Sequence, residues 1–73
     1  MRVKLSEPRL FDDLCAFLGR AGWICAPHDR ESVNLLVPDA GTDLEAELLV
    51  LAKIEEWKTR YPDVTVTVGT FVA

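Results

Sequence analysis

The sequence predicts a single α+β domain in which two helices cover one face of an antiparallel sheet. Three observations lead to this expectation. A length of 73 residues leaves room for one domain only. Two segments carry apolar residues at helical spacing, and four short segments are apolar or alternate in the way strands do. Because no linker, repeat or low-complexity segment interrupts the chain, residues 1–73 are expected to form one unit.

The chain is expected to begin with a strand and a helix. Residues 2–5 alternate basic and apolar side chains, which predicts a short strand with its two apolar residues buried. Ser6 stands where it would cap a helix, with Pro8 in the first turn. The apolar residues of this helix fall on one side: Leu10, Leu14, Phe17, Leu18 and Ala21. Gly22 is placed to end the helix in a left-handed conformation.

A hairpin, a second helix and a last strand are expected to follow. The strands are predicted at 23–26, 33–37 and 64–68. The helix should begin at Thr42, whose spacing to Glu45 is that of a capping box. It should end near Tyr61, because Pro62 cannot continue it.

The resulting βαββαβ order predicts a ferredoxin-like sandwich, with two helices on one face of a four-stranded antiparallel sheet, if both crossovers are right-handed. The open face of that sheet is expected to carry Arg2, Lys4, Asn34, Leu36, Thr65 and Thr67. This face lacks the stacked aromatic residues of an RNA-binding sheet. In an alternative arrangement, residues 2–5 do not pair within the chain and the sheet is completed by strand exchange with a second copy.

Composition argues against several classes of function. The net charge is −4, and the 8 basic residues are scattered, so nucleic-acid binding is not expected. The longest apolar run, residues 48–52, is far shorter than the roughly 20 residues that cross a bilayer, so no membrane span is expected. Met1 leads directly into Arg-Val-Lys-Leu and not into an apolar signal segment, which predicts a cytoplasmic protein with reduced cysteines.

The second helix carries more apolar surface than one face can bury. At 100° per residue its apolar positions form two stripes: Val50, Ile54, Trp57 and Tyr61 in the first, and Leu44, Leu48, Leu51 and Ala52 in the second. Either both stripes wrap the chain's own core, or one packs against a second subunit. A hydrophobic content of 49% is high for so short a chain and supports a homodimer or another protein partner. The candidate interface residues are Leu44, Leu48, Leu51, Val50, Ile54, Trp57 and Tyr61.

Few residues are arranged for catalysis or metal binding. Cys25 and His28 are three residues apart, the minimum for an activated nucleophile or half of a metal site. Only Cys15 offers another soft ligand, so no enzyme activity, metal or cofactor is expected. Neighbouring acidic residues, Asp12 with Asp13 and Glu55 with Glu56, point about 100° apart on a helix and are interpreted as solvated charges.

The loop before the first helix is a candidate ligand site. It contains Ser6, Glu7 and Arg9, and a helix N-terminus leaves backbone N–H groups that suit a small anion or carboxylate. Ordinary capping by Ser6 is the alternative explanation of the same pattern.

Residues 6–23, Ser-Glu-Pro-Arg-Leu-Phe-Asp-Asp-Leu-Cys-Ala-Phe-Leu-Gly-Arg-Ala-Gly-Trp, are similar in pattern to the first helix of ACT-type regulatory domains. The resemblance implies a βαββαβ fold and amino-acid binding at the start of that helix, where ACT domains commonly have glycine and this chain has Arg9. The chain also resembles short uncharacterised bacterial proteins with the pattern Arg2-Val3, Ser6-x-Pro8, Asp13-Leu14, Phe17-Leu18, Trp57 and Tyr61-Pro62. That second resemblance implies no function.

These observations favour a non-enzymatic interaction or regulatory module that acts as a homodimer. The alternative is an ACT-like sensor that binds an amino acid or another small anion at the start of the first helix.

Overall fold

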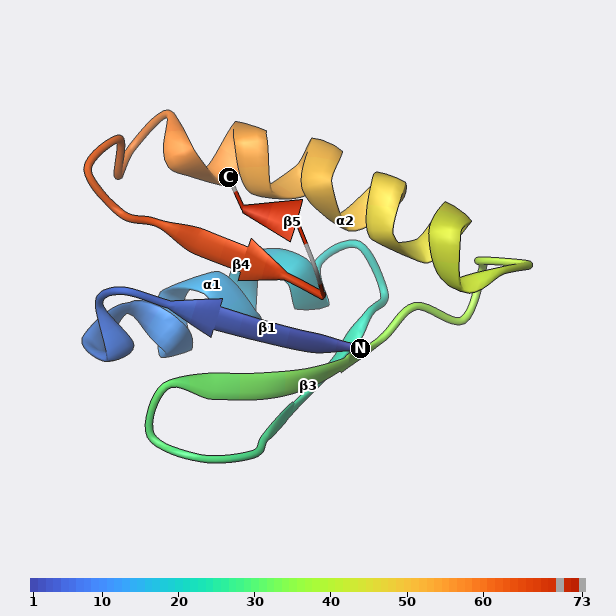
Figure 1. Cartoon of the computed structure of the whole chain (residues 1–73), viewed down its shortest axis with the longest axis horizontal. Helices are drawn as coiled ribbons and strands as arrows, with labels where there is room; N and C mark the ends of the chain where they lie inside the picture. The colour runs from blue at the N-terminus through green and yellow to red at the C-terminus, as the bar shows by residue number, and fades with distance from the viewer. Residues whose placement is uncertain (70, 73) are drawn as a thin grey trace.

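The computed structural model describes residues 1–69 and 71–72 and has an α+β architecture (Figure 1). Its elements are β1 (Arg2–Leu5), the short 3-10 helix η1 (Pro8–Leu10), α1 (Phe11–Gly19), β2 (Ile24–Pro27), β3 (Ser32–Leu36), α2 (Asp43–Lys58), β4 (Val66–Val68) and β5 (Phe71–Val72). The strands form one antiparallel sheet in the order β2-β3-β1-β4-β5. The α+β class is confirmed, but the sheet has five strands and not the expected four.

The fifth strand exists because the chain reverses at Gly69. This residue has a φ of +58°, which L-residues with a Cβ rarely adopt. After it, Phe71 pairs with Val68 and Val72 with Thr67. The reversal adds one more strand at this edge of the sheet.

β1 is the central strand and pairs on both sides within its own chain. Val3 lies opposite Val33 of β3 and Val68 of β4. The arrangement expected for strand exchange, with residues 2–5 unpaired in their own chain, is therefore not the one in this structure. The first residues of the chain therefore pair with strands from both its middle and its end.

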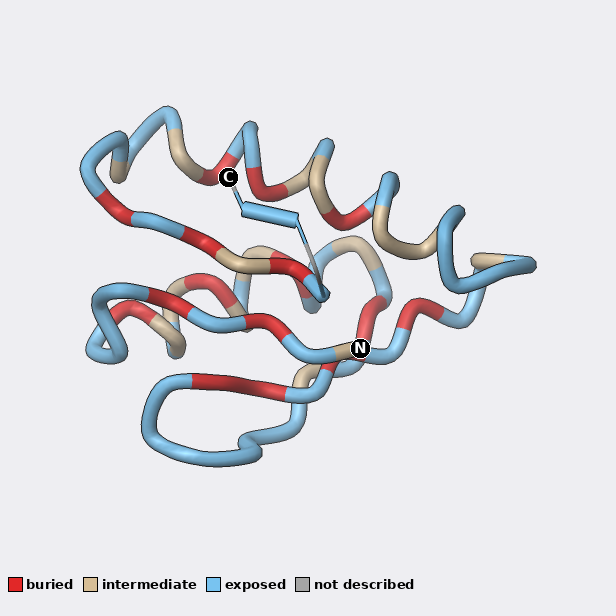
Figure 2. Tube along the Cα trace, viewed as in Figure 1, coloured by how far each residue is buried: buried red, intermediate tan, exposed pale blue. Residues whose placement is uncertain are grey.

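Alternate strand residues and both helices bury their side chains in one core (Figure 2). The fully buried side chains include Val3, Leu14, Leu18, Val50, Ile54, Trp57, Val66 and Val68. Since α1 and α2 contribute to the same cluster as the inward-facing strand residues, both helices pack on the same face of the sheet. The opposite face carries Arg2, Lys4, Asn34, Leu36 and Thr65 as exposed residues, as expected, and Thr67 as a half-buried one.

The first helix starts differently from the expectation. Ser6 was predicted to cap it, but the Ser6 hydroxyl accepts a hydrogen bond from the backbone N–H of Thr65 at 2.9 Å, and the Ser6 N–H donates to the Thr65 carbonyl at 3.0 Å. Ser6 therefore extends the β1–β4 ladder. The chain turns next into η1 and then into α1, and neither start has a side-chain cap within the described residues.

The second helix starts as expected, with one change in its cap. Thr42 Oγ1 accepts the N–H of Glu45 at 3.1 Å, which confirms half of the predicted capping box. The Glu45 carboxylate accepts the N–H of Gly41 at 3.3 Å in place of the Thr42 N–H. The helix ends at Lys58, where Thr59 donates its hydroxyl to the Glu56 carbonyl at 2.7 Å, three residues before the expected end at Tyr61.

Replacing Gly69 by alanine should destabilise the fold by about 1 to 2 kcal/mol, because the left-handed backbone is strained for alanine. A Cβ at this position would also collide with the Glu47 side chain. Gly19→Ala is the matched control, since Gly19 is helical and a Cβ there meets no atom within 4 Å among the described residues. We expect the control to be neutral or slightly stabilising in urea unfolding. Equal stability of the two variants would contradict the role given to Gly69.

Candidate functional site

The structure decides which stripe of α2 faces the core. Val50, Ile54 and Trp57 are fully buried, and Tyr61, just beyond the helix, is half-buried against them. These four candidate interface residues therefore belong to the chain's own interior. The Trp57 and Tyr61 rings pack at a centroid distance of 4.7 Å with an interplanar angle of 36°.

The second stripe of α2 lies beside the core and largely outside it. Leu44 is 59% exposed and Leu48 is 57% exposed, while Leu51 is half-buried and packs against the core. Leu44 and Leu48 are one helical turn apart, so their side chains are neighbours on the helix surface. In the isolated chain, both of these large apolar side chains therefore remain in contact with water.

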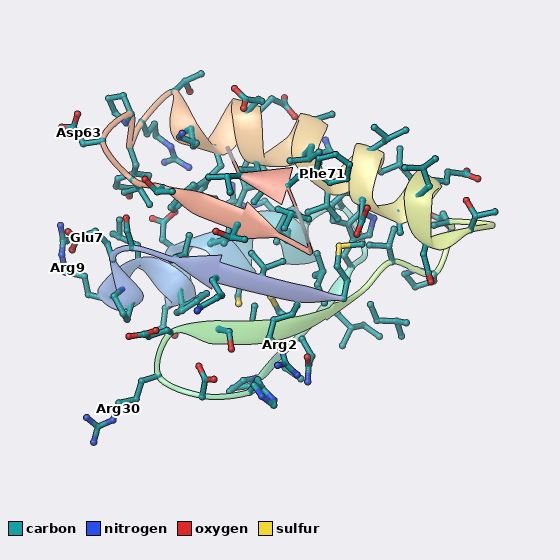
Figure 3. The ribbon with its side chains drawn as sticks, in the orientation of Figure 1. Arg2, Glu7, Arg9, Arg30, Asp63 and Phe71 are labelled. Atoms are coloured by element: carbon teal, nitrogen blue, oxygen red, sulfur yellow. The ribbon has the colours of Figure 1, made fainter. Side chains whose placement is uncertain are left out.

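Phe71 adds an aromatic ring at the same side of the molecule. It lies directly opposite Val68, and residues opposite each other in an antiparallel pair project to the same face of the sheet. Because Val68 is fully buried on the helix-covered face, Phe71 projects to that face from the edge strand, and Figure 3 shows it on the α2 side of β5. It is 38% exposed. Glu47 of α2 approaches Gly69, just before β5, which brings the helix and this edge together.

We define the α2 flank as Leu44, Leu48, Leu51 and Phe71. Charged residues lie along the whole of α2. Its beginning is acidic, with Asp43, Glu45 and Glu47, and its later part carries both signs, with Lys53, Lys58 and Arg60 beside Glu55 and Glu56. Glu47 and Lys58 are eleven residues apart, which is about three turns, so they lie on the same side of the helix with Leu51 between them.

A hydrogen-bonded carboxylate holds α2 in this rotational setting. Asp13 of α1 accepts a hydrogen bond from the Trp57 indole Nε1 at 2.9 Å on one oxygen and from the Tyr61 hydroxyl at 2.9 Å on the other. The interpretation of Asp13 as a solvated charge was wrong. The local sequence does not indicate that Asp13 pairs with residues more than forty positions away. Its neighbour Asp12 is the same residue type and is exposed, so the pattern does not distinguish the two.

The same contacts shift the ionisation of both partners. The hydrogen bonds from Trp57 and Tyr61 hold the pKa of Asp13 below its usual value, and the hydrogen bond to Asp13 raises the pKa of Tyr61. A carboxylate with a lowered pKa in the folded state stabilises the fold above its unfolded pKa of about 4. This contribution is lost as the pH falls through the pKa of the folded state. The clamp between α1 and α2 is therefore strongest at neutral pH.

The candidate ligand loop does not form one site. Ser6 lines a depression of about 310 Å³ on the sheet together with Lys4, Glu31, Thr65 and Thr67. Glu7 and Arg9 form an exposed ion pair at 3.3 Å and border a different depression of about 330 Å³, which Arg60, Tyr61 and Asp63 also line. Glu7, Arg9 and Asp63 lie at the same end of the molecule (Figure 3).

Cys25 and His28 do not form a catalytic pair. His28 is exposed and lies 3.4 Å from an Arg2 guanidinium nitrogen and 3.9 Å from an Asp29 carboxylate oxygen. Burial, together with a hydrogen bond to Cys15, raises the pKa of the Cys25 thiol to about 12, so this thiol is a poor nucleophile at neutral pH. Within residues 1–69 and 71–72, no group of three or more His, Cys, Asp or Glu side chains is placed to hold a metal ion.

Comparison with known proteins gave no match to a family model, to a curated protein or to a solved structure. Among the helices of the described residues, none has the length and apolar character needed to traverse a membrane.

The chain has one tyrosine, so the phenolate absorbance reports Tyr61 alone. We expect its titration midpoint to lie above the ordinary value of about 10 in the wild type and to move down in Asp13→Asn, because the negative charge that accepts the hydroxyl proton is lost. Asp12→Asn, at the exposed neighbour, should leave the midpoint unchanged. An unchanged midpoint in folded Asp13→Asn, with folding checked by circular dichroism at each pH, would contradict the clamp.

Proposed function

We propose that the protein is a non-enzymatic interaction module that acts as a homodimer through the α2 flank. The observation that carries this proposal is the exposure of Leu44 and Leu48 after the other stripe of α2 has filled the core. Contiguous apolar surface of this kind marks association sites in small proteins. A chain of 73 residues also gains more from association than a large one, because it buries a smaller part of its own surface.

Charge complementarity supports a second copy of the chain as the partner. In an antiparallel pair of α2 helices, Glu47 near the beginning of one helix can face Lys58 at the end of the other. A twofold axis between Ala52 and Lys53, midway between these two residues, would place Glu47 against Lys58 of the partner subunit, and the symmetry repeats this ion pair. Leu48 and Leu51 then lie between the two ion pairs. A parallel pair in register would bring Glu47 against Glu47 and Lys58 against Lys58.

The fold that we propose for this module is a ferredoxin-like βαββαβ unit with β5 added at one edge. The strand order, with β1 between β3 and β4, supports this assignment. The same order supports the resemblance to ACT-type regulatory domains, and with it a regulatory role. The two free cysteines support a cytoplasmic location.

Leu48→Glu should weaken the dimer, because it places a carboxylate in the proposed interface. We expect sedimentation equilibrium to show at least a tenfold increase in the dissociation constant, about 1.4 kcal/mol. Leu49→Glu is the matched control, since Leu49 is 40% exposed on the other side of the same helix. It should dimerise like the wild type. A wild type that stays monomeric up to about 1 mM, where binding is worth only about 4 kcal/mol, would contradict the proposal.

Charge reversal distinguishes an antiparallel pair of helices from other dimers. Glu47→Lys and Lys58→Glu should each weaken the dimer, and the double variant should recover it because both ion pairs are restored with opposite sign. Failure of the double variant to recover, with both single variants weakened, would contradict the antiparallel arrangement and leave the apolar contact in place.

A second candidate function is an amino-acid sensor at the depression that Glu7 and Arg9 border. Arg9 and Arg60 are available there for a carboxylate, and Glu7 and Asp63 for an ammonium group, which is the pairing a free amino acid requires. This depression, and not the hydroxyl of Ser6, is the part of the candidate loop that supports a ligand.

The sensor is tested by thermal denaturation with each amino acid in large excess. Binding at 100 times the dissociation constant stabilises the fold by about 2.7 kcal/mol, which in a domain of this size raises the melting temperature by about 10 °C or more. Arg60→Gln should remove the shift, and Arg30→Gln, at an exposed loop position outside this depression, should keep it. The absence of a shift with every amino acid would exclude this function.

A further inference from the structure

The register of the β2–β3 hairpin places the Cys25 side chain beneath the helices. Cys25 lies directly opposite Leu35, which is almost fully buried in the core. Residues opposite each other in an antiparallel pair project to the same face, so Cys25 also projects to the helix-covered face. It is half-buried and packs against the core.

Cys15 comes to the same place from α1. It precedes the last residue of that helix by four positions, about 6 Å along the helix axis, and the chain then reverses through Gly22 and returns as β2. Cys25 is the second residue of β2, so the reversal sets the two cysteines at a similar level. Both cysteines are free and half-buried against the same core, and the neighbouring Cys15 thiol contributes to the raised pKa of Cys25.

We propose that Cys15 and Cys25 form a reversible intramolecular disulfide by exchange with a small-molecule disulfide such as glutathione disulfide. In the first step the Cys15 thiolate attacks one sulfur of glutathione disulfide, forms a mixed disulfide and releases one glutathione thiolate. In the second step the Cys25 thiolate attacks the sulfur of Cys15 and displaces the second glutathione. The protein loses two hydrogen atoms, and one glutathione disulfide is reduced to two glutathione molecules.

The environment of the pair sets the order of these steps. Burial raises the pKa of Cys25, and the neighbouring Cys15 thiol raises it further, so Cys25 is a poor attacking thiol in the reduced protein. Once Cys15 is in a mixed disulfide, the contribution of its thiol to the pKa of Cys25 is gone and that of burial remains. Cys25 lies beside Cys15 and is therefore the thiol placed to resolve the mixed disulfide.

The bond would fasten the end of α1 to β2 without involving α2. The two cysteines lie in α1 and β2, whereas the proposed dimer contact uses α2 and β5. The inference is thus independent of the proposed function, and either can fail alone. The bond closes a short loop, and we expect it to raise the melting temperature by about 10 °C relative to the reduced protein.

The test incubates the reduced full-length chain with glutathione disulfide at low protein concentration, blocks free thiols with N-ethylmaleimide and measures the intact mass. We expect a monomer that has lost two hydrogen atoms, takes up no maleimide and yields one peptide pair joined through Cys15 and Cys25. Excess reduced glutathione should restore two reactive thiols. Cys25→Ser should stop at a single glutathione adduct on Cys15, and Cys15→Ser should react more slowly.

Three results would overturn the proposal. They are full maleimide labelling after prolonged oxidation, a stable protein with two glutathione adducts, and a disulfide found only between two chains. Each is read from the wild-type protein, so the conclusion does not depend on whether the cysteine variants fold.

Discussion

The hydrogen bonds that Asp13 accepts from Trp57 and Tyr61 determine how the rest of the structure is arranged. The Asp13 carboxylate accepts one hydrogen bond from the Trp57 indole and one from the Tyr61 hydroxyl, each at 2.9 Å. Indole and hydroxyl groups near a core need such partners, because an unpaired polar group away from water is costly. A single negative charge therefore fixes the distance between the two helices and the rotation of α2 about its axis.

That rotation has a direct consequence for the surface. With Val50, Ile54 and Trp57 turned towards the sheet, the leucines about 120° away on the same helix cannot be buried by the same sheet. Both stripes of the helix are apolar. The polar ends of Trp57 and Tyr61 favour the observed rotation, because it brings both of them to Asp13.

Local patterns in the sequence were sufficient for the elements that depend on local chemistry. Thr42 and Glu45 predicted the start of α2, and Gly22 predicted the left-handed residue that follows α1. Apolar and alternating segments predicted β1 to β4 to within two residues, and β5 was not predicted. Contacts between distant parts of the chain could not be predicted in this way. The local pattern around Ser6 indicates a helix cap, and that around Asp13 indicates a solvated charge. Their actual partners, Thr65 and Trp57, are distant in the sequence. The interface predicted from the sequence therefore included residues of both stripes of α2. Only the tertiary structure shows which stripe is buried and which is exposed.

The open sheet face offers a rival apolar surface, and its setting explains why the α2 flank is the stronger candidate. Ile24 and Leu36 are both more than half exposed and lie directly opposite each other on β2 and β3. Their neighbours on this face are polar, with Arg2 hydrogen-bonded to Asn34 at 3.4 Å. A partner that covered this pair would have to desolvate that guanidinium group. The α2 flank continues instead from one leucine to the next along the helix, and Glu47 and Lys58 lie beside these leucines, where they can orient the partner.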